Sequence, residues 1–81
     1  MLLTVEIEKP KNSYNIKEVP EVAICFDDEG LEHFIRRLKS LKGKRDHEHL
    51  MTPAYAGTDL TEVKQGGEDY ILINHLRLVH L

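Results

Sequence analysis

The sequence predicts an α+β domain in which one amphipathic helix packs on a mostly antiparallel sheet of about four strands, in the order β-β-α-β-β. Three observations lead to this fold: a helical pattern of apolar residues in mid-chain, apolar or alternating runs on both sides of it, and a glycine-rich turn before the last run. Residues 1–81 make a single domain, because a core of this size cannot be divided and still exclude water.

The helix is expected from about Asp28 to Lys42. Asp27 or Asp28 can cap its start, basic residues gather in its last turns, and Gly43 suits the left-handed position that ends a helix. Only one stripe of it is apolar, so a sheet is expected beneath that stripe. The stripe has the spacing of a single helical face and consists of Leu31, Phe34, Ile35, Leu38 and Leu41.

Two strands are expected before the helix. Residues 2–8 alternate apolar and polar side chains, which predicts a half-exposed strand that Pro10 ends. Residues 22–26 are apolar on both faces, which predicts a central strand. Residues 14–19 have a weaker pattern, which fits either a short edge strand or a connection.

Two more strands are expected after the helix, at residues 47–52 and 70–81. The sequence Gln65-Gly66-Gly67 predicts a turn before the last strand, and residues 60–64 are candidates to pair across it.

Composition indicates a globular domain, with 41% apolar and 31% charged residues. No apolar run approaches the roughly 20 residues of a membrane-spanning helix, and the first residues lack the features of a signal peptide. We therefore expect a cytoplasmic protein without membrane contacts. The lone Cys25 cannot form an intrachain disulfide and is expected to be a small buried apolar residue. Because so short a chain buries only a small core, we keep a homodimer as an alternative to a monomer.

The formal net charge is −3, but the charges are unevenly placed. Residues 36–45 hold six lysines and arginines and no acid. Such a segment could bind nucleic acid, and a nucleic-acid-binding module is the alternative function. Cations at the end of a helix also complement its dipole, which explains their position without a nucleic acid.

Five histidines raise the question of a metal site. On a strand, His47 and His49 point to the same face, and His75 or His80 could add a third ligand. Nothing in the spacing fixes that third ligand, so a small metal-binding protein is a further alternative, and no metal or other cofactor is expected. Ser13 and Ser40 lie outside any nucleophile motif, and no phosphate-binding loop is present. We expect no enzymatic activity.

A loop from Thr52 to Leu60 is the candidate contact surface for a protein partner. It combines small residues, an aromatic residue and polar side chains between two structured segments, and such loops often bind partners. The alternative is that Tyr55 folds back on the core edge. The candidate partner-binding residues are His47, His49, Thr52, Tyr55, Thr58 and Asp59.

The segment from Asp46 to Leu60 resembles the bacterial immunity protein 32 family, which accompanies polymorphic toxins. The likeness lies in a histidine followed after two residues by Thr52, an aromatic–glycine loop and a leucine. It continues in the sequences Ile73-Asn74-His75-Leu76-Arg77-Leu78 and Glu29-Gly30-Leu31-Glu32. Tyr55 stands where tryptophan is expected in that pattern, and Ala56 where glycine is expected.

The resemblance implies an α+β immunity protein that binds a cognate toxin domain and blocks it inside the producing cell. Many such toxins, nucleases among them, act on nucleic acids and carry basic clefts. An acidic inhibitor would gain association rate and specificity from the complementary charge.

Overall fold

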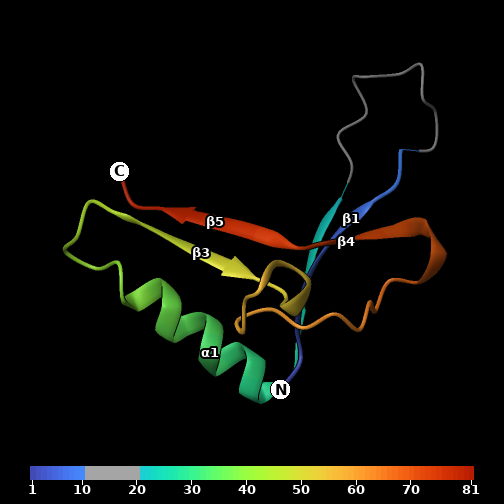
Figure 1. The fold of residues 1–81 in the computed structure, drawn as a ribbon, viewed down its shortest axis with the longest axis horizontal. Helices are drawn as coiled ribbons and strands as arrows, with labels where there is room; N and C mark the ends of the chain where they lie inside the picture. Colours follow the sequence, from blue (N-terminus) through green and yellow to red (C-terminus); the bar gives the residue numbers. More distant parts are fainter. Residues whose placement is uncertain (11–20) are drawn as a thin grey trace.

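The computed structural model describes residues 1–10 and 21–81 (Figure 1). Within them the chain forms one α-helix and five strands in two antiparallel sheets, which confirms the α+β class. The tentative strand at 14–19 lies outside the described residues. In chain order the elements are β1 (Leu3–Glu8), β2 (Val22–Phe26), α1 (Asp28–Lys39), β3 (His47–Met51), β4 (Tyr70–Ile73) and β5 (His75–Val79).

The larger sheet has the strand order β2-β1-β4, so the expectation that residues 22–26 form the central strand is wrong. β1 occupies the centre and β2 lies at an edge. The alternation of β1 is misleading because its polar residues are also buried: Thr4 Oγ1 donates to the Glu6 carboxylate at 2.6 Å, and both side chains are inaccessible. A polar pair that satisfies its own hydrogen bonds can occupy an interior face.

The second sheet pairs β3 with β5, and it arises because the single strand expected at 70–81 is divided at Asn74. Thr52 holds this division in place. Its backbone N–H donates to the Asn74 carbonyl at 3.0 Å, and its hydroxyl donates to Asn74 Oδ1 at 2.8 Å. Residues 60–64 form no strand. Instead Thr61 N–H donates to the Leu3 carbonyl at 2.7 Å, which lays this segment beside β1.

The helix begins at Asp28 as the sequence predicts, but it ends at Lys39 rather than at about Lys42. Turns continue the chain from there to Gly43. Asp27 Oδ1 accepts a hydrogen bond from Gly30 N–H at 2.7 Å, and Gly43 has a left-handed φ of 75°. Glycine is required at position 30, because a Cβ there would lie 1.8 Å from the Leu2 carbonyl oxygen. This close approach ties the start of the helix to the segment that enters β1.

The packing of the helix differs from the expectation. Leu41 is buried and Phe34 packs against the core, but Leu31, Ile35 and Leu38 remain 37%, 38% and 44% exposed. The core is therefore small, and it lies where the two sheets and the helix meet. It consists of Leu3, Val5, Leu50 and Leu60, with Phe34, Ile73, Leu76 and Leu78 packed partly against them.

No helix in residues 1–10 and 21–81 combines the length and apolar character needed to cross a membrane.

Candidate functional site

The loop after β3 is a compact turn held by backbone hydrogen bonds. The Thr52 carbonyl accepts from both Tyr55 N–H and Gly57 N–H at 2.9 Å, around a 3-10 turn at Pro53–Tyr55. Gly57 passes so close to β3 that a Cβ would lie 2.4 Å from the Met51 carbonyl oxygen. The loop is thus built to present its outer side chains in fixed positions.

Of the candidate contact residues in this loop, Tyr55 and Thr58 are exposed and Thr52 is not. Thr52 is completely buried, so its expected place on a contact surface is wrong: its side chain fastens the loop to Asn74. Tyr55 is the largest side chain of the turn and is 56% exposed. The interpretation that Tyr55 seals the core edge does not fit this exposure.

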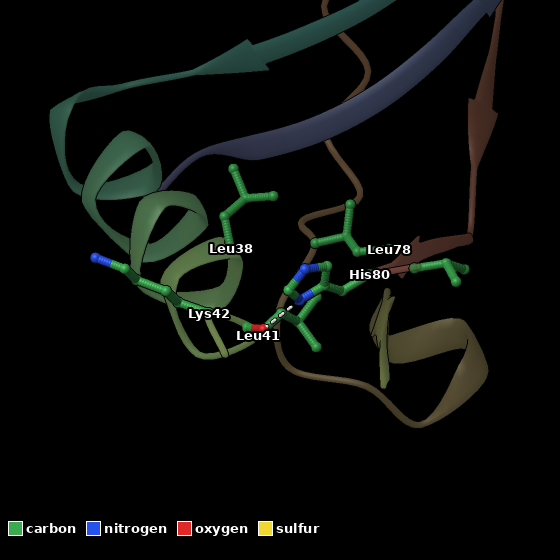
Figure 2. A pocket seen from close by; sticks show the side chains of 6 residues that line it. Leu38, Leu41, Lys42, Leu78 and His80 are labelled. Atoms are coloured by element: carbon green, nitrogen blue, oxygen red, sulfur yellow. Dashed lines mark hydrogen bonds between the residues drawn. The ribbon is translucent and has the colours of Figure 1, made fainter. Parts of the chain in front are cut away.

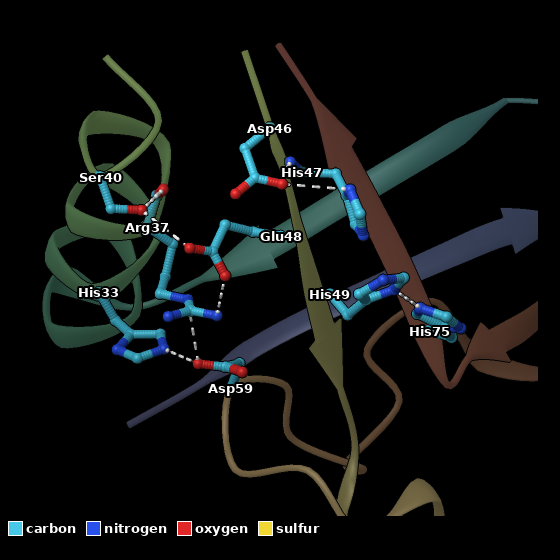
Figure 3. A network of polar contacts seen from close by, with 9 residues as sticks. All are labelled: His33, Arg37, Ser40, Asp46, His47, Glu48, His49, Asp59 and His75. Carbon is cyan, nitrogen blue, oxygen red and sulfur yellow. Dashed lines mark hydrogen bonds and ion pairs between the residues drawn. The ribbon is translucent and has the colours of Figure 1, made fainter. Parts of the chain in front are cut away.

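Asp59 joins the loop to the helix (Figure 3). Its Oδ1 atom lies 2.8 Å from His33 Nε2 and 3.5 Å from Arg37 Nε. Arg37 also donates from Nη2 to Glu48 on β3 at 2.8 Å. Helix, loop and strand are therefore connected by one polar network. Asp59 is only 17% exposed, so it supports the loop more than it offers a free charge to a partner.

One residue of the basic segment 36–45 takes part in that network. Arg37 forms ion pairs with Glu48 and Asp59, whereas the other cations of the segment are exposed: Arg36, Lys39, Lys42, Lys44 and Arg45. These cations surround the end of α1, where they complement its dipole.

The histidines of β3 gather on the outer face of the second sheet. His49 Nδ1 lies 2.7 Å from His75 Nε2 on β5, and the rings of His47 and His49 meet edge to face at a centroid distance of 4.8 Å. Desolvation, together with the nearby charges of His47, His75 and Arg77, lowers the pKa of His49. A histidine so placed stays neutral to lower pH than a free one.

The arrangement of the histidines also bears on the metal-binding alternative. In the part of the chain that the structure describes, no three histidine, cysteine or acidic side chains stand in an arrangement that could hold an ion. His80, a possible third ligand by sequence, instead places Nδ1 2.7 Å from the Leu41 carbonyl oxygen.

An apolar groove lies between the end of α1 and β5 (Figure 2). Leu38, Leu41 and Lys42 line it from the end of the helix, and Leu78, Val79 and His80 line it from β5 and the residue after it. Its volume is about 350 Å³. The groove shows that the helix does not close fully on the sheets.

No sequence pattern singles out β2 as a site, yet β2 carries the most exposed apolar side chains of any described strand. Val22, Ile24 and Phe26 are 60%, 38% and 47% exposed. Their position was missed because an apolar run without charges is typical of a buried strand. The signal that could have found it is the charge around it: residues 21–35 contain five acids and neither lysine nor arginine.

Comparison with known proteins adds no relative: no family model, curated protein or solved structure matches the chain.

Proposed function

We propose that this chain is a non-enzymatic binding protein of the bacterial cytoplasm that neutralises a cognate toxin domain by direct contact. The observation that carries the proposal is the apolar surface of β2 and α1, which a single copy of the chain leaves open. Six large apolar side chains there are each more than a third exposed: Val22, Ile24, Phe26, Leu31, Ile35 and Leu38. Large exposed apolar patches mark protein-binding sites.

The toxin as partner follows from the resemblance of residues 46–60 to immunity proteins. Charge supports it, since a net charge of −3 suits a partner with a basic cleft. The rigid turn that presents Tyr55 supports it as well, because a fixed aromatic side chain can be desolvated at little entropic cost and is a typical binding hot spot. His47, His49 and Thr58 are exposed near this turn or on the adjoining strand and belong to the same proposed contact surface.

The exposed cations around the end of α1 favour a second function, nucleic-acid binding. It differs from the first in its salt dependence, because contacts with phosphates release counterions and weaken steeply as salt rises.

The test is co-expression of the chain with the large toxin-like product of its neighbouring gene. We expect a complex that survives purification and restores growth of cells producing the toxin. Tyr55→Ala should weaken the complex by about 2 kcal/mol, whereas Val63→Ala, at an exposed apolar residue outside the loop, should leave it unchanged. If the toxin-like product is not bound and duplex DNA or RNA is bound in a salt-sensitive way that Arg36→Gln abolishes, the proposal fails and the second function replaces it.

A further inference from the structure

We infer that β2 is an open edge to which an extended segment of the partner adds as a further strand, and that this segment is apolar with lysine or arginine at its ends. The inference rests on the proposed function, because it describes the part of the toxin that would be recognised. It also goes beyond the loop around Tyr55, since β2 belongs to the other sheet.

The backbone of β2 has hydrogen-bonding groups directed away from the sheet. Glu8 N–H donates to the Glu21 carbonyl at 2.9 Å, and Asp27 N–H donates to the Leu2 carbonyl at 3.2 Å. Because bonded pairs alternate along an antiparallel ladder, Ala23 and Cys25 are the β2 residues that bond to β1. The N–H and C=O groups of Val22, Ile24 and Phe26 therefore point to the open side, where no other described strand lies.

The side chains of the same three residues offer an apolar surface to an added strand. The register pairs Phe26 with Leu3 and Ile24 with Val5, so these side chains share one face of the sheet. On that face Leu3 and Val5 are buried, whereas the β2 residues beside them are exposed. A strand next to β2 would cover them and would continue an apolar layer that the sheet already contains.

The edge lacks the features by which proteins usually prevent strand addition. Edge strands are commonly protected by lysine, proline or a bulge. Residues 22–26 contain no charged residue and no proline, and their pairing with β1 runs without interruption. The open edge is therefore suited to binding by strand addition, in which backbone hydrogen bonds supply affinity and side-chain contacts supply specificity.

Charge decides which kind of segment fits. The acids of residues 21–35 stand at both ends of β2: Glu21 on one side, and Asp27, Asp28 and Glu29 on the other. Glu21 is held in place by the hydroxyl of Tyr70, which donates to it at 2.8 Å. A segment with basic ends would pair with these carboxylates.

The same charges disfavour a second copy of the chain as the occupant. Two β2 strands paired antiparallel about Ile24 would set Glu21 of one copy opposite Asp27 of the other. Like charges directly opposite each other destabilise a strand pair. The strand that fits this edge is therefore a cationic one from a different protein.

The first experiment uses a synthetic peptide with an alternating valine–threonine core and two lysines at each end. Its control has the same core with two glutamates at each end. We expect the lysine peptide to bind at least about tenfold more tightly than its control. In hydrogen-exchange NMR it should slow exchange at the amides of Val22, Ile24 and Phe26 while changing Ala23 and Cys25 little. Equal binding of both peptides, or protection elsewhere only, overturns the inference.

The second experiment uses the toxin complex and two variants. Ile24→Pro removes an outward N–H without removing a bond to β1, and proline is tolerated at such edge positions. Ile71→Thr, at an exposed apolar residue on the opposite edge strand, is the control. We expect Ile24→Pro to weaken the complex at least about tenfold and the control to leave it unchanged. Circular dichroism checks that both fold; if Ile24→Pro does not, Ile24 amide exchange in the wild-type complex decides the matter.

The outcomes separate the two proposals. If the toxin binds wild type and Ile24→Pro equally, or leaves Ile24 exchange unchanged, β2 is not the docking edge although the function stands. If no toxin binds but the lysine peptide protects β2, the toxin proposal fails and the edge remains a binding site. Self-association of the wild-type chain that Ile24→Pro abolishes, measured by sedimentation, would assign the edge to a second copy and overturn the inference.

Discussion

The two sides of the central strand β1 are built differently. On the side of β4, the segment 60–66 adds hydrogen bonds to β1: Thr61 N–H donates to the Leu3 carbonyl, and the Gln65 and Gly66 N–H groups donate to the Glu6 carboxylate. On the side of β2, large apolar side chains face solvent and the outer backbone groups have no strand beside them in the described chain. We call these the closed side and the open side. β1 pairs with both neighbours, so the difference lies in what each side adds to that pairing: side-chain and loop hydrogen bonds on the β4 side, and exposed apolar side chains on the β2 side.

Glu6 is the clearest feature of the closed side. Its carboxylate is fully buried and accepts hydrogen bonds from Thr4 Oγ1 at 2.6 Å, from Gln65 N–H at 3.0 Å and from Gly66 N–H at 2.8 Å. Burial by itself opposes the charged form, but these donors outweigh it and lower the pKa of Glu6. Glu6 thus fastens the turn before β4 onto the centre of the sheet.

The largest expected effect is the difference in lost unfolding free energy between a core residue and a residue of the exposed helix stripe. Leu50→Ala, at a fully buried residue, should cost about 2–5 kcal/mol of unfolding free energy because it leaves a cavity. Leu38→Ala should cost less, about 1 kcal/mol, because this side chain is already 44% exposed in the free protein. Urea denaturation followed by circular dichroism measures both. Equal losses would mean that the helix stripe is covered in solution, and the distinction between the two sides would fail there.

A smaller effect is expected for Glu6→Gln. The variant keeps the shape of the side chain but sets an amide among donors that need an acceptor, so it should cost about 1–3 kcal/mol. The cost should also depend on pH. Because the pKa of Glu6 is lowered on folding, its stabilisation is complete above the ordinary glutamate pKa of 4.5 and is lost as the pH falls through the lowered value.

Denaturation at a series of pH values from neutral to acidic tests this. The stability difference between wild type and Glu6→Gln should shrink as the pH falls below 4.5. A difference that stays constant over this range would show that the charge of Glu6 does not hold the turn.

The smallest effect has the opposite sign and lies in the loop. Ala56 has a left-handed backbone with φ of 61°, where a Cβ is strained. Ala56→Gly should therefore stabilise the protein by about 0.5–1 kcal/mol. Ala54→Gly, two residues earlier in the 3-10 turn, is the matched control and should be neutral or destabilising. Thermal unfolding of both variants tests the pair, and equal effects of the two substitutions would show that the left-handed backbone of Ala56 is not the cause.

The sequence predicts the type and the start of an element in this chain better than it predicts which segment lies beside that element. The helix from Asp28 and its cap at Asp27 follow from side-chain spacing and short-range hydrogen bonds, which a sequence pattern contains. The position of β2 depends on which segment lies beside it. Its uninterrupted apolar run is compatible with a buried strand or with a binding edge, and only the fold distinguishes them.

The same limit applies to the candidate site. The loop could be located because proline, glycine and an aromatic residue mark a structured turn, and its exposed Tyr55 fits that prediction. Thr52 could not be assigned correctly, because its burial depends on Asn74, which is 22 residues away in sequence. Asp59 likewise takes its partner His33 from the helix. The polar residues of a loop cannot be sorted into free and engaged ones without these distant contacts.

The strand order also determines when this sheet can be completed during synthesis. β1 and β2 are close in sequence and can pair early, but the residues that pair with the far side of β1 extend to Ile73. Non-local pairings of this kind form late, because a long loop must close first. A nascent chain of which only the first half has left the ribosome therefore has two strand edges without partners. A ribosome-bound chain arrested before Tyr70 would be the form most prone to aggregation.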